Sequence, residues 1–549
     1  MKKCLSAVLA FTVIALHLTA WGYCKGSVKF EPLEYPSEAV CEFVPEKLNR
    51  ASSKLDFDAN SGYDETGIYI SPYWNCFVNS EEISAYSALT YDYALDRGVL
   101  QSFACIWADL SGGELKIDLL TDALSVKDAV VLPESSEIKC DFSDKRVTFT
   151  VSDYGIYTCL VNNASQEYAF TLFVREYTDE EKAIEEYKNK FGEQNVLVFE
   201  KGYYETEKID GDGYKVVYFC RGSYFSAKHI YDIPDEEAFS ALPAREAFIS
   251  LYGKSGVIIS GGGTFDFTAL DRKERDPVII ANCTDCTAEG LIFINSDHWT
   301  LNVSASSDIR INDIAAVAYR ANSDGINVCG SENVSVTNSF MRNGDDSFSV
   351  KTMEPGRKAH DISFENCVAW STKARCFGIT GEVEDDIYNV TFKNCSVVCR
   401  NAVWDNDRIA SLAITVENGK GNIENIKFEN IEIFSDAGRA INCVVYGKEV
   451  KDCKIRNIVF KDISYNSNMK SQVCSDCNLN FCGRINAFLY RFLTKLGLDG
   501  KLTDKLSEKI GNNSVEFTFS NVRANGHLIT EKNSCRFVSA TGVTQCSFE

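Results

Sequence analysis

Two stretches of the sequence decide the fold: Ile362-Ser363-Phe364-Glu365-Asn366-Cys367-Val368 and Val390-Thr391-Phe392-Lys393-Asn394-Cys395-Ser396-Val397. In both, apolar and polar residues alternate as they do in a half-buried strand, and an Asn stands where the chain must turn. An α-helix does not fit, because the apolar runs are short and have a period of two. The stretches therefore predict short strands joined by tight corners.

The same pattern recurs from about residue 195 onward. Phenylalanines repeat at gaps of 28, 36 and 32 residues, at Phe364, Phe392, Phe428 and Phe460. An Asn also follows successive apolar segments, at Asn295, Asn312, Asn338, Asn366, Asn394 and Asn430. Repeats of this length indicate the coils of a solenoid, with Phe and Ile stacked inside and Asn side chains in ladders at the corners. We predict an all-β protein with a right-handed parallel β-helix over residues 195–549.

One insertion near residues 470–512 interrupts the repeats. Apolar residues recur there with helical spacing, at Ile485, Phe488, Leu489, Phe492, Leu493 and Leu496. The pattern predicts an amphipathic helix. Such a helix could cap an exposed solenoid face, act as a lid, bind a partner or associate with a membrane.

A different pattern precedes the solenoid. Residues 27–176 contain short alternating strands, the clearest of which carries Val147, Phe149 and Val151. The series Asp153-x-Gly155-x-Tyr157-x-Cys159 resembles the tyrosine corner of immunoglobulin-like sandwiches. Trp107 follows Cys105 too closely for a true immunoglobulin domain. We predict an immunoglobulin-like β-sandwich, followed by a charged linker helix over residues 177–194.

The N-terminus has the features of a signal peptide over residues 1–26, with Lys2-Lys3 before an apolar run. We therefore expect a secreted or cell-surface protein, with no membrane segment beyond the signal peptide. Export allows disulfide bonds, which the 22 cysteines would suit. Many cysteines lie in apolar β repeats, where a buried thiol acts as a small hydrophobic group. The Cys-x-x-Cys pairs lack a complete ligand set, so we expect no metal.

The net charge of the chain limits the classes of molecule that it can bind. The chain has 56 Lys and Arg against 78 Asp and Glu, a net charge of −22. Such a chain repels nucleic acids and anionic polymers unless a local basic patch intervenes. We expect a monomer that acts on a polysaccharide, with no nucleic-acid partner.

Three aspartates lie close together in the predicted solenoid, in Asn322-Ser323-Asp324 and Gly344-Asp345-Asp346. Asp324 and Asp345 are 21 residues apart, about one repeat, so we expect them to stack roughly 5 Å apart. Asp346 reaches the same patch only if a bulge or a strand end lies there, and Gly344 permits one. Carboxyl groups gathered in this way suit glycoside cleavage, but Asp also suits solenoid corners. Both interpretations remain open on spacing alone.

The same motifs resemble the Asn-x-Asp and Asp-Asp motifs of the polygalacturonase family, glycoside hydrolase family 28, which has a pectin-lyase-like β-helix. The similarity runs from about residue 261 to 446. Residues 345–417 also resemble the dextranase and isopullulanase family 49, whose members carry a β-sandwich ahead of the β-helix. The resemblance implies hydrolysis in one step with inversion and without a cofactor. It implies that Asp345 is the general acid and that Asp324 and Asp346 activate water.

Two regions depart from the polygalacturonase pattern. Family 28 carries a Gly-His-Gly motif and an Arg-x-Lys motif that holds the uronate carboxylate. The corresponding segments here are Ala374–Glu382, which lacks His, and Ser411–Glu417, which lacks Arg and Lys. A uronate site needs a fixed cation, and the nearby candidates are Lys351 and Arg375. The departures therefore favour a neutral or mixed glycan.

Further residues are candidates for substrate binding: Asn322, Lys351, Arg375, Glu382 and Trp404. Arg375 and Glu382 would bind sugar hydroxyls or pair with each other. Lys351 is either a structural partner of the aspartates or a substrate contact. Trp299, Trp370 and Trp404 could stack on sugar rings or belong to the core.

Two alternatives to a neutral-glycan hydrolase remain. One is a polygalacturonase or rhamnogalacturonase that uses Arg375 or Lys351 for the missing cations. The other is a non-catalytic β-helix protein that binds carbohydrate or acts as an adhesin. Three mutually repelling acids argue against the second, because a site without chemistry has no reason to hold them.

Overall fold

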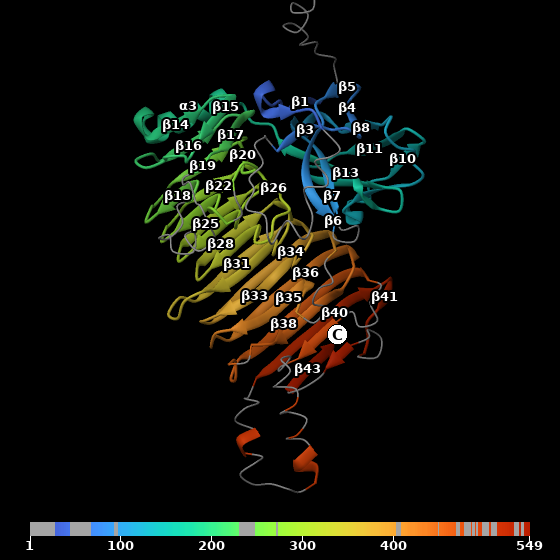
Figure 1. The fold of residues 1–549 in the computed structure, drawn as a ribbon, viewed down its shortest axis with the longest axis vertical. Coiled ribbons are helices and arrows are strands. Elements are labelled where there is room, and N and C mark those ends of the chain that lie inside the picture. The colour runs from blue at the N-terminus through green and yellow to red at the C-terminus, as the bar shows by residue number, and fades with distance from the viewer. Residues whose placement is uncertain are drawn as a thin grey trace, which may run out of the picture.

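The computed structural model describes residues 28–43, 67–92, 97–229, 247–270, 273–401, 408–447, 449–467, 473–476, 485, 489, 492–496, 504–506, 513–531, 537–539 and 543–549. The predicted signal peptide, Trp404 and most of the predicted insertion near 470–512 lie outside these residues. Figure 1 shows a β-sandwich beside the N-terminal part of a long stack of β coils.

The sandwich is built from two sheets. The larger contains β1 (Lys29–Pro32), β2 (Val40–Cys41), β3 (Ile68–Ile70), β6 (Tyr86–Asp92), β7 (Arg97–Asp109), β9 (Ala129–Leu132), β12 (Gly155–Val161) and β13 (Ser165–Glu176). The smaller contains β4 (Asn75–Val78), β5 (Glu81–Ile83), β8 (Leu115–Leu120), β10 (Cys140–Ser143) and β11 (Arg146–Val151). The predicted alternation in β11 is confirmed, because Val147, Phe149 and Val151 are buried while their neighbours are not. The Tyr157 hydroxyl donates to the Asp153 carbonyl at 2.8 Å, as in a tyrosine corner.

A helix links the sandwich to the coils. Helix α3 (Glu180–Phe191) begins after Asp179, whose carboxylate accepts from the Lys182 N–H at 3.1 Å and caps the helix. The short 3-10 turns are η1 (Ser37–Ala39), η3 (Leu110–Gly112), η4 (Glu134–Ser136) and η5 (Glu193–Asn195).

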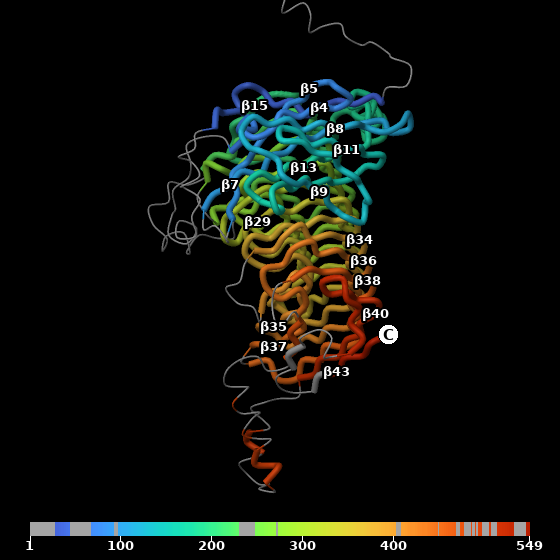
Figure 2. Tube along the Cα trace, turned by 90° about the vertical axis from the view of Figure 1, so that its right-hand side faces the viewer, coloured from blue at the N-terminus to red at the C-terminus, as the bar shows by residue number. Residues whose placement is uncertain are grey.

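The coils form a right-handed parallel β-helix, as predicted. Its 20-stranded sheet contains β14 (Val196–Phe199), β15 (Gly202–Thr206), β16 (Val216–Phe219), β17 (Ser223–Ala227), β19 (Ile258–Gly261), β20 (Thr264–Asp266), β22 (Thr287–Glu289), β23 (Ile292–Ile294), β25 (Ser307–Asn312), β26 (Ala315–Val317), β28 (Glu332–Thr337), β29 (Phe340–Asn343), β31 (Ala359–Glu365), β32 (Val368–Ser371), β34 (Ile387–Arg400), β36 (Ile423–Asp436), β38 (Lys454–Ser467), β40 (Ser514–Ala524), β41 (His527–Leu528) and β43 (Val543–Phe548). Its 10-stranded sheet contains β18 (Ile249–Tyr252), β21 (Val278–Ala281), β24 (Leu301–Ser304), β27 (Ile326–Cys329), β30 (Phe348–Thr352), β33 (Phe377–Val383), β35 (Ala410–Asn418), β37 (Arg439–Val445), β39 (Val473–Asp476) and β42 (Phe537–Ser539). Figure 2 shows the coils stacked along the length of the molecule.

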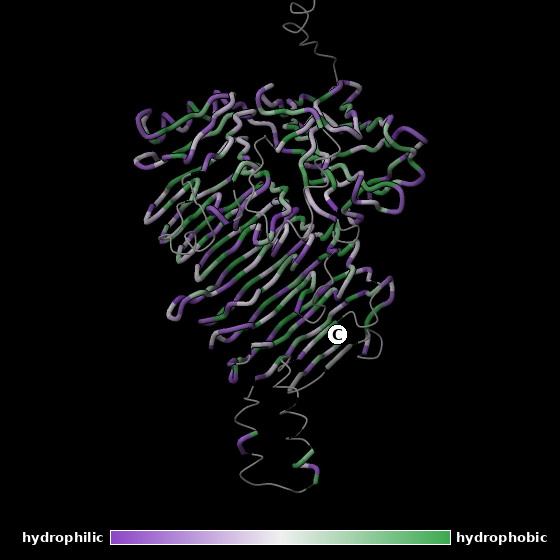
Figure 3. Tube along the Cα trace, in the orientation of Figure 1, coloured by the Kyte–Doolittle hydropathy of each residue, from purple (hydrophilic) through white to green (hydrophobic). Residues whose placement is uncertain are grey.

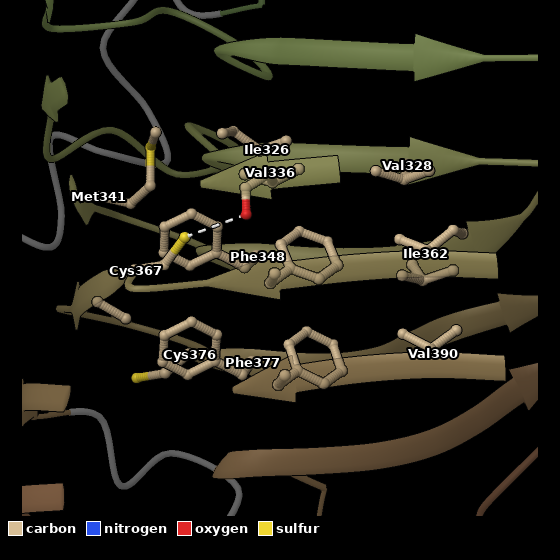
Figure 4. Close-up of a cluster of buried hydrophobic side chains, with 14 of the residues drawn as sticks. Ile326, Val328, Val336, Met341, Phe348, Ile362, Cys367, Cys376, Phe377 and Val390 are labelled. Atoms are coloured by element: carbon tan, nitrogen blue, oxygen red, sulfur yellow. Dashed lines mark hydrogen bonds between the residues drawn. The ribbon is translucent and has the colours of Figure 1, made fainter. Parts of the chain in front are cut away.

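Stacked side chains hold the coils together. Phe364, Phe392, Phe428 and Phe460 form a column with ring centroids 4.8 to 4.9 Å apart. A second column places Phe348 and Phe377 5.0 Å apart, among the aliphatic side chains in Figure 4. Burial of one such ring stabilises the fold by roughly 1.5–3 kcal/mol. Figure 3 shows the matching alternation of hydrophobic and hydrophilic positions along the strands.

The corner asparagines form the predicted ladder. Asn338, Asn366, Asn394 and Asn430 have φ between 52° and 56°, a left-handed conformation that Asn tolerates well. The Asn366 amide donates to the Asn338 carbonyl oxygen at 3.3 Å, and Asn430 donates to Asn394 at 2.9 Å. The sequence pattern thus marks the corner of each coil.

The sandwich covers one layer of the β-helix. The Phe173 ring contacts the Phe340 ring at 5.4 Å, and the Trp370 indole N–H donates to the Gln166 side chain at 3.0 Å. Arg342, next to Phe340, lies over Trp370 at 3.7 Å and donates to Gln101. The sandwich therefore covers the strands β26, β29 and β32 of the 20-stranded sheet. The 10-stranded sheet forms a different face of the β-helix.

The predicted disulfide bonds are not seen among the described cysteines. Most of the described cysteines are buried, and Cys367 and Cys395 are free thiols. Cys367 and Cys395 illustrate the alternative, since both lie in the apolar core of the β-helix. No helix in the described part of the chain has the length and apolar character needed to cross a bilayer.

Candidate active site

The strand register of the 10-stranded sheet decides which aspartates stack. Ile326, Phe348 and Phe377 are register partners in successive coils. Asp324, Asp346 and Arg375 each stand two residues before one of these positions. The Gly325 N–H donates to the Asp346 carbonyl at 2.8 Å, which keeps this register just outside the strands. The expected stacking of Asp324 on Asp345 is therefore wrong by one residue, because Asp346 is the register partner of Asp324.

Asp345 reaches the same patch because the chain turns there. Strand β29 ends at Asn343 and β30 begins at Phe348, so Asp345 and Asp346 lie at a strand end, one of the two expected alternatives. The Asn343 amide holds the turn by donating to the Asp345 and Asp346 carbonyls at 2.8 and 3.1 Å. A Cβ on Gly344 would lie 2.2 Å from the Arg320 carbonyl oxygen, so the turn requires glycine.

The three carboxyl groups form one cluster, with an oxygen of each within 4.8 Å of the others. The Lys351 ammonium lies 3.6 Å from Asp324, 3.7 Å from Asp346 and 3.5 Å from Glu382. Lys351 is thus a partner of the aspartates, one of its two predicted roles.

A second cation holds Asp346. The Arg375 guanidinium donates to both Asp346 carboxylate oxygens at 3.2 Å, and to the Arg408 carbonyl at the same distance. The predicted pairing of Arg375 with Glu382 is therefore not observed. A bulge in β33 relative to β30 shifts Glu382, and its partner is Lys351.

Burial and these contacts shift the pKa values of the three aspartates in different directions. Asp324 and Asp346 are each 2% exposed, whereas Asp345 is half-buried. Burial favours the neutral form of Asp346, but Arg375 and Lys351 outweigh it and hold its pKa below the usual value. Burial and the charge of Asp346 raise the pKa of Asp345. Burial, followed by the charge of Asp345, raises the pKa of Asp324 well above the ordinary value.

Asp324 and Asp345 both have raised pKa values, and Asp345 is the one of the two without a cation contact. Among the described residues, no cation lies within 4.0 Å of its carboxyl group, whereas Asp324 and Asp346 both contact Lys351. Its oxygens accept from the backbone N–H groups of Asn322 and Asp346 at 3.2 and 3.0 Å. Asn322, a predicted substrate contact, therefore positions the acid through its backbone.

The tryptophans have different surroundings. Trp370 has 0% exposure and belongs to the contact with the sandwich, so it is core. Trp299 is half-buried, and the Lys351 ammonium lies 4.9 Å from its ring. Trp404 lies outside the described residues.

The place of Trp299 in the aspartate column and the contact made by Asn327 were not predicted from the sequence. Trp299 stands two residues before Leu301, the register partner of Ile326, and so precedes Asp324 in the same column. Asn327, the second residue of β27, donates to Asp324 at 3.1 Å. Alignment of the coils by their first inward residue would have found both.

Three carboxylates this close could also hold a divalent cation. The Lys351 ammonium already lies between two of them and Glu382, and Arg375 covers Asp346. These fixed cations supply the positive charge that a metal ion would bring, so the donor set does not fit a metal well.

A right-handed parallel β-helix with three clustered carboxyl groups at one face has the features of one class of protein, the β-helical glycoside hydrolases. Comparison with known proteins supports the same class. Residues 251–487 match the family model described as Glycosyl hydrolases family 28, a range that includes all three aspartates.

Two curated relatives illustrate the similarity. The chain is 26% identical over 200 residues to Exopolygalacturonase A of Aspergillus niger, covering 34% of this chain and 46% of the relative. It is 24% identical over 228 residues to Alpha-L-rhamnosidase rgxB of Aspergillus niger, covering 38% of this chain and 52% of the relative. The chain therefore spans about half the length of these relatives.

A solved structure extends the likeness in fold. Dex49A from Penicillium minioluteum aligns with a TM-score of 0.57 at 12% identity, covering 96% of this chain and 100% of that structure. Because the alignment covers nearly the whole chain, the shared fold includes both the sandwich and the β-helix.

Proposed function

We propose that the protein is a secreted glycoside hydrolase that cleaves O-glycosidic bonds of a neutral or mixed polysaccharide with inversion. Asp345 donates a proton to the leaving oxygen, and Asp324 and Asp346 activate the attacking water. The observation that carries the proposal is the cluster itself, three carboxyl groups within 4.8 Å of one another. The signal-peptide pattern of residues 1–26 supports secretion.

The surroundings of the acids support these roles. A general acid must hold a proton near the working pH, and the raised pKa of Asp345 meets that need. A base must be ionised, and Asp346 is kept so by Arg375 and Lys351. Asp324 helps to orient the water and shares the Lys351 ammonium with Asp346.

The partners of Lys351 and Arg375 support a neutral sugar. Lys351 is buried and Arg375 is half-buried, and both contact carboxylates of the protein, so neither is free to bind a uronate. The polygalacturonase alternative rests on the names of relatives, such as Exopolygalacturonase A. It requires one of these cations to leave its carboxylate partners, which costs free energy in a buried site.

We expect the neutral polymers dextran, pullulan and arabinan to be cleaved faster than polygalacturonate, the polymer made of uronate alone. Release of reducing sugar is measured on dextran, pullulan, arabinan, rhamnogalacturonan and polygalacturonate at equal concentration. A preference for polygalacturonate would contradict the neutral-substrate proposal and assign Arg375 or Lys351 to the uronate. No release from any of the five would argue against hydrolysis of these polymers, while the appearance of an ultraviolet-absorbing unsaturated product would indicate a lyase.

The first-formed product is expected to have the inverted anomeric configuration. The distance between the carboxyl groups bears on this outcome. The two catalytic carboxyl groups are usually about 6.5–9.5 Å apart in inverting enzymes and about 5–5.5 Å apart in retaining enzymes. A separation within 4.8 Å is closer to the retaining value, whereas the family resemblance implies inversion. Proton NMR of the early product decides, and a retained anomer would instead assign one of the three acids as a nucleophile.

A further inference from the structure

A cavity of about 900 Å³ lies between the sandwich and the β-helix. Ligand pockets of proteins usually have volumes of about 300–1,000 Å³. None of the three aspartates lines this cavity. It is therefore separate from the candidate active site.

One wall of the cavity is the corner ladder. Asn338, Asn366, Asn394 and Asn430 all line it, and all four are exposed. Successive coils are one strand spacing apart, so the wall presents an amide about every 4.8 Å. An amide both donates and accepts hydrogen bonds, and the ladder bonds use only part of this capacity.

Other lining residues come from the sandwich and helix α3. They include Tyr154, which is 44% exposed, and Tyr187, which is half-buried. A tyrosine ring combines an apolar face with a hydroxyl group. Tyrosine rings and a row of amides in one cavity provide the two kinds of contact that a sugar chain makes, through its apolar ring faces and its hydroxyl groups.

The charges in the cavity favour a neutral ligand. Arg175 pairs with Asp313 at 2.9 Å, and Arg221 pairs with Glu31 at 2.6 Å. Both guanidinium groups are therefore matched by carboxylates. The lining also contains acidic side chains, among them Glu176 and Glu289, so a polyanion would be repelled.

The cavity and the active site lie at opposite ends of the covered layer. Asn338 precedes β29, whereas Asp345 follows it. A strand of this length separates its two ends by roughly 13 Å. A polymer bound in the cavity would therefore leave the aspartates accessible.

We propose that this cavity is a second binding site for a neutral glycan chain, which holds the polymer near the enzyme while the aspartates cleave it. The inference rests on the proposed function in taking the polymer to be the substrate. A second contact raises the effective concentration of the polymer at the active site without any change in the chemistry.

The test uses the full chain carrying Asp345→Asn, so that bound polymer is not degraded. Retardation of the protein is measured in native gels that contain dextran, pullulan or arabinan. A gel that contains polygalacturonate tests binding of an anionic polymer. The cavity variant is Asn338→Gly with Asn366→Gly, because glycine accepts the positive φ of both positions while removing the amides. We expect the cavity variant to weaken neutral-polymer binding about tenfold.

The matched control is Asn425→Gly with Asn457→Gly. These residues form a second exposed ladder, with φ of 57° and 52° and a connecting hydrogen bond of 2.6 Å, but they do not line the cavity. In chains with Asp345 intact, both double variants should hydrolyse a short oligosaccharide at the parental rate.

Equal binding by the cavity and control variants would overturn the proposal, as would a parent that no neutral polymer retards. Retardation by polygalacturonate alone would overturn the neutral-glycan assignment. These outcomes are distinct from failure of the proposed function, which would appear as undiminished hydrolysis in the chain carrying Asp345→Asn.

Discussion

Replacement of Asp345 by Asn is expected to lower kcat about 100- to 10,000-fold, the range that a general acid contributes. Asn has nearly the shape of the neutral acid, but it has no proton to give to the leaving oxygen. The measurement is kcat on the best polymer of the screen, with the pH–rate profile of the parent beside it. In the parent, the rate should fall as pH rises through the raised pKa of Asp345.

The fold should survive this change. The pKa of Asp345 is raised on folding, so its contribution to stability is present at low pH and is lost as pH rises through the folded value. Because Asn does not ionise, the variant does not lose stability in this way as pH rises. It should be no less stable than the parent at neutral pH. Asp361→Asn is the control, because Asp361 is an exposed corner residue whose carboxylate accepts from Asn389. Unchanged turnover in Asp345→Asn would remove the assigned mechanism.

Replacement of Lys351 by Met should reduce the free energy of unfolding at pH 7 by about 3–5 kcal/mol, the cost of removing one partner from a buried ion pair. The ammonium is buried and contacts Asp324, Asp346 and Glu382. Without it, Asp324, at 2% exposure, loses its cation, and Asp346 keeps only Arg375. Lys461→Met is the control, because its contact with Glu429 is exposed and should contribute less than about 1 kcal/mol.

The loss in Lys351→Met should depend on pH. Without the ammonium, the raised folded-state pKa of Asp324 rises further, so the folded chain binds more protons than the unfolded chain above about pH 4. Stability then falls as pH rises through this window. Urea unfolding at pH 4.5 and pH 7 measures the effect, and an equal loss at both values would show that the ammonium does not compensate these carboxylates.

Much of the fold could be predicted from local patterns. The alternation around Phe364 and Phe392 and the corner asparagines follow from strand geometry and from the tolerance of Asn for positive φ. The tyrosine corner at Tyr157 could also be recognised, because its hydrogen bond to Asp153 joins residues four apart. Such features depend on neighbours in the chain and are visible without a structure.

The site was only partly predictable. The motifs located Asp324, Asp345 and Asp346, but the register that pairs Asp324 with Asp346 depends on where each strand begins. The contact of Lys351 with Glu382 depends on a bulge in β33, and the contact of Arg375 with Asp346 depends on the same strand register. A shift of one residue turns a side chain to the other face, so spacing alone could not assign these partners.

The sequence by itself determined the repeating strands, the corners between them and the acids that the corners carry, because each depends on residues close together in the chain. Only the tertiary structure decided which charges neutralise one another, that Trp370 is core, and that a cavity separates the sandwich from the corner ladder. These features arise where coils and domains distant in sequence meet, and side-chain contacts across such distances are set by packing.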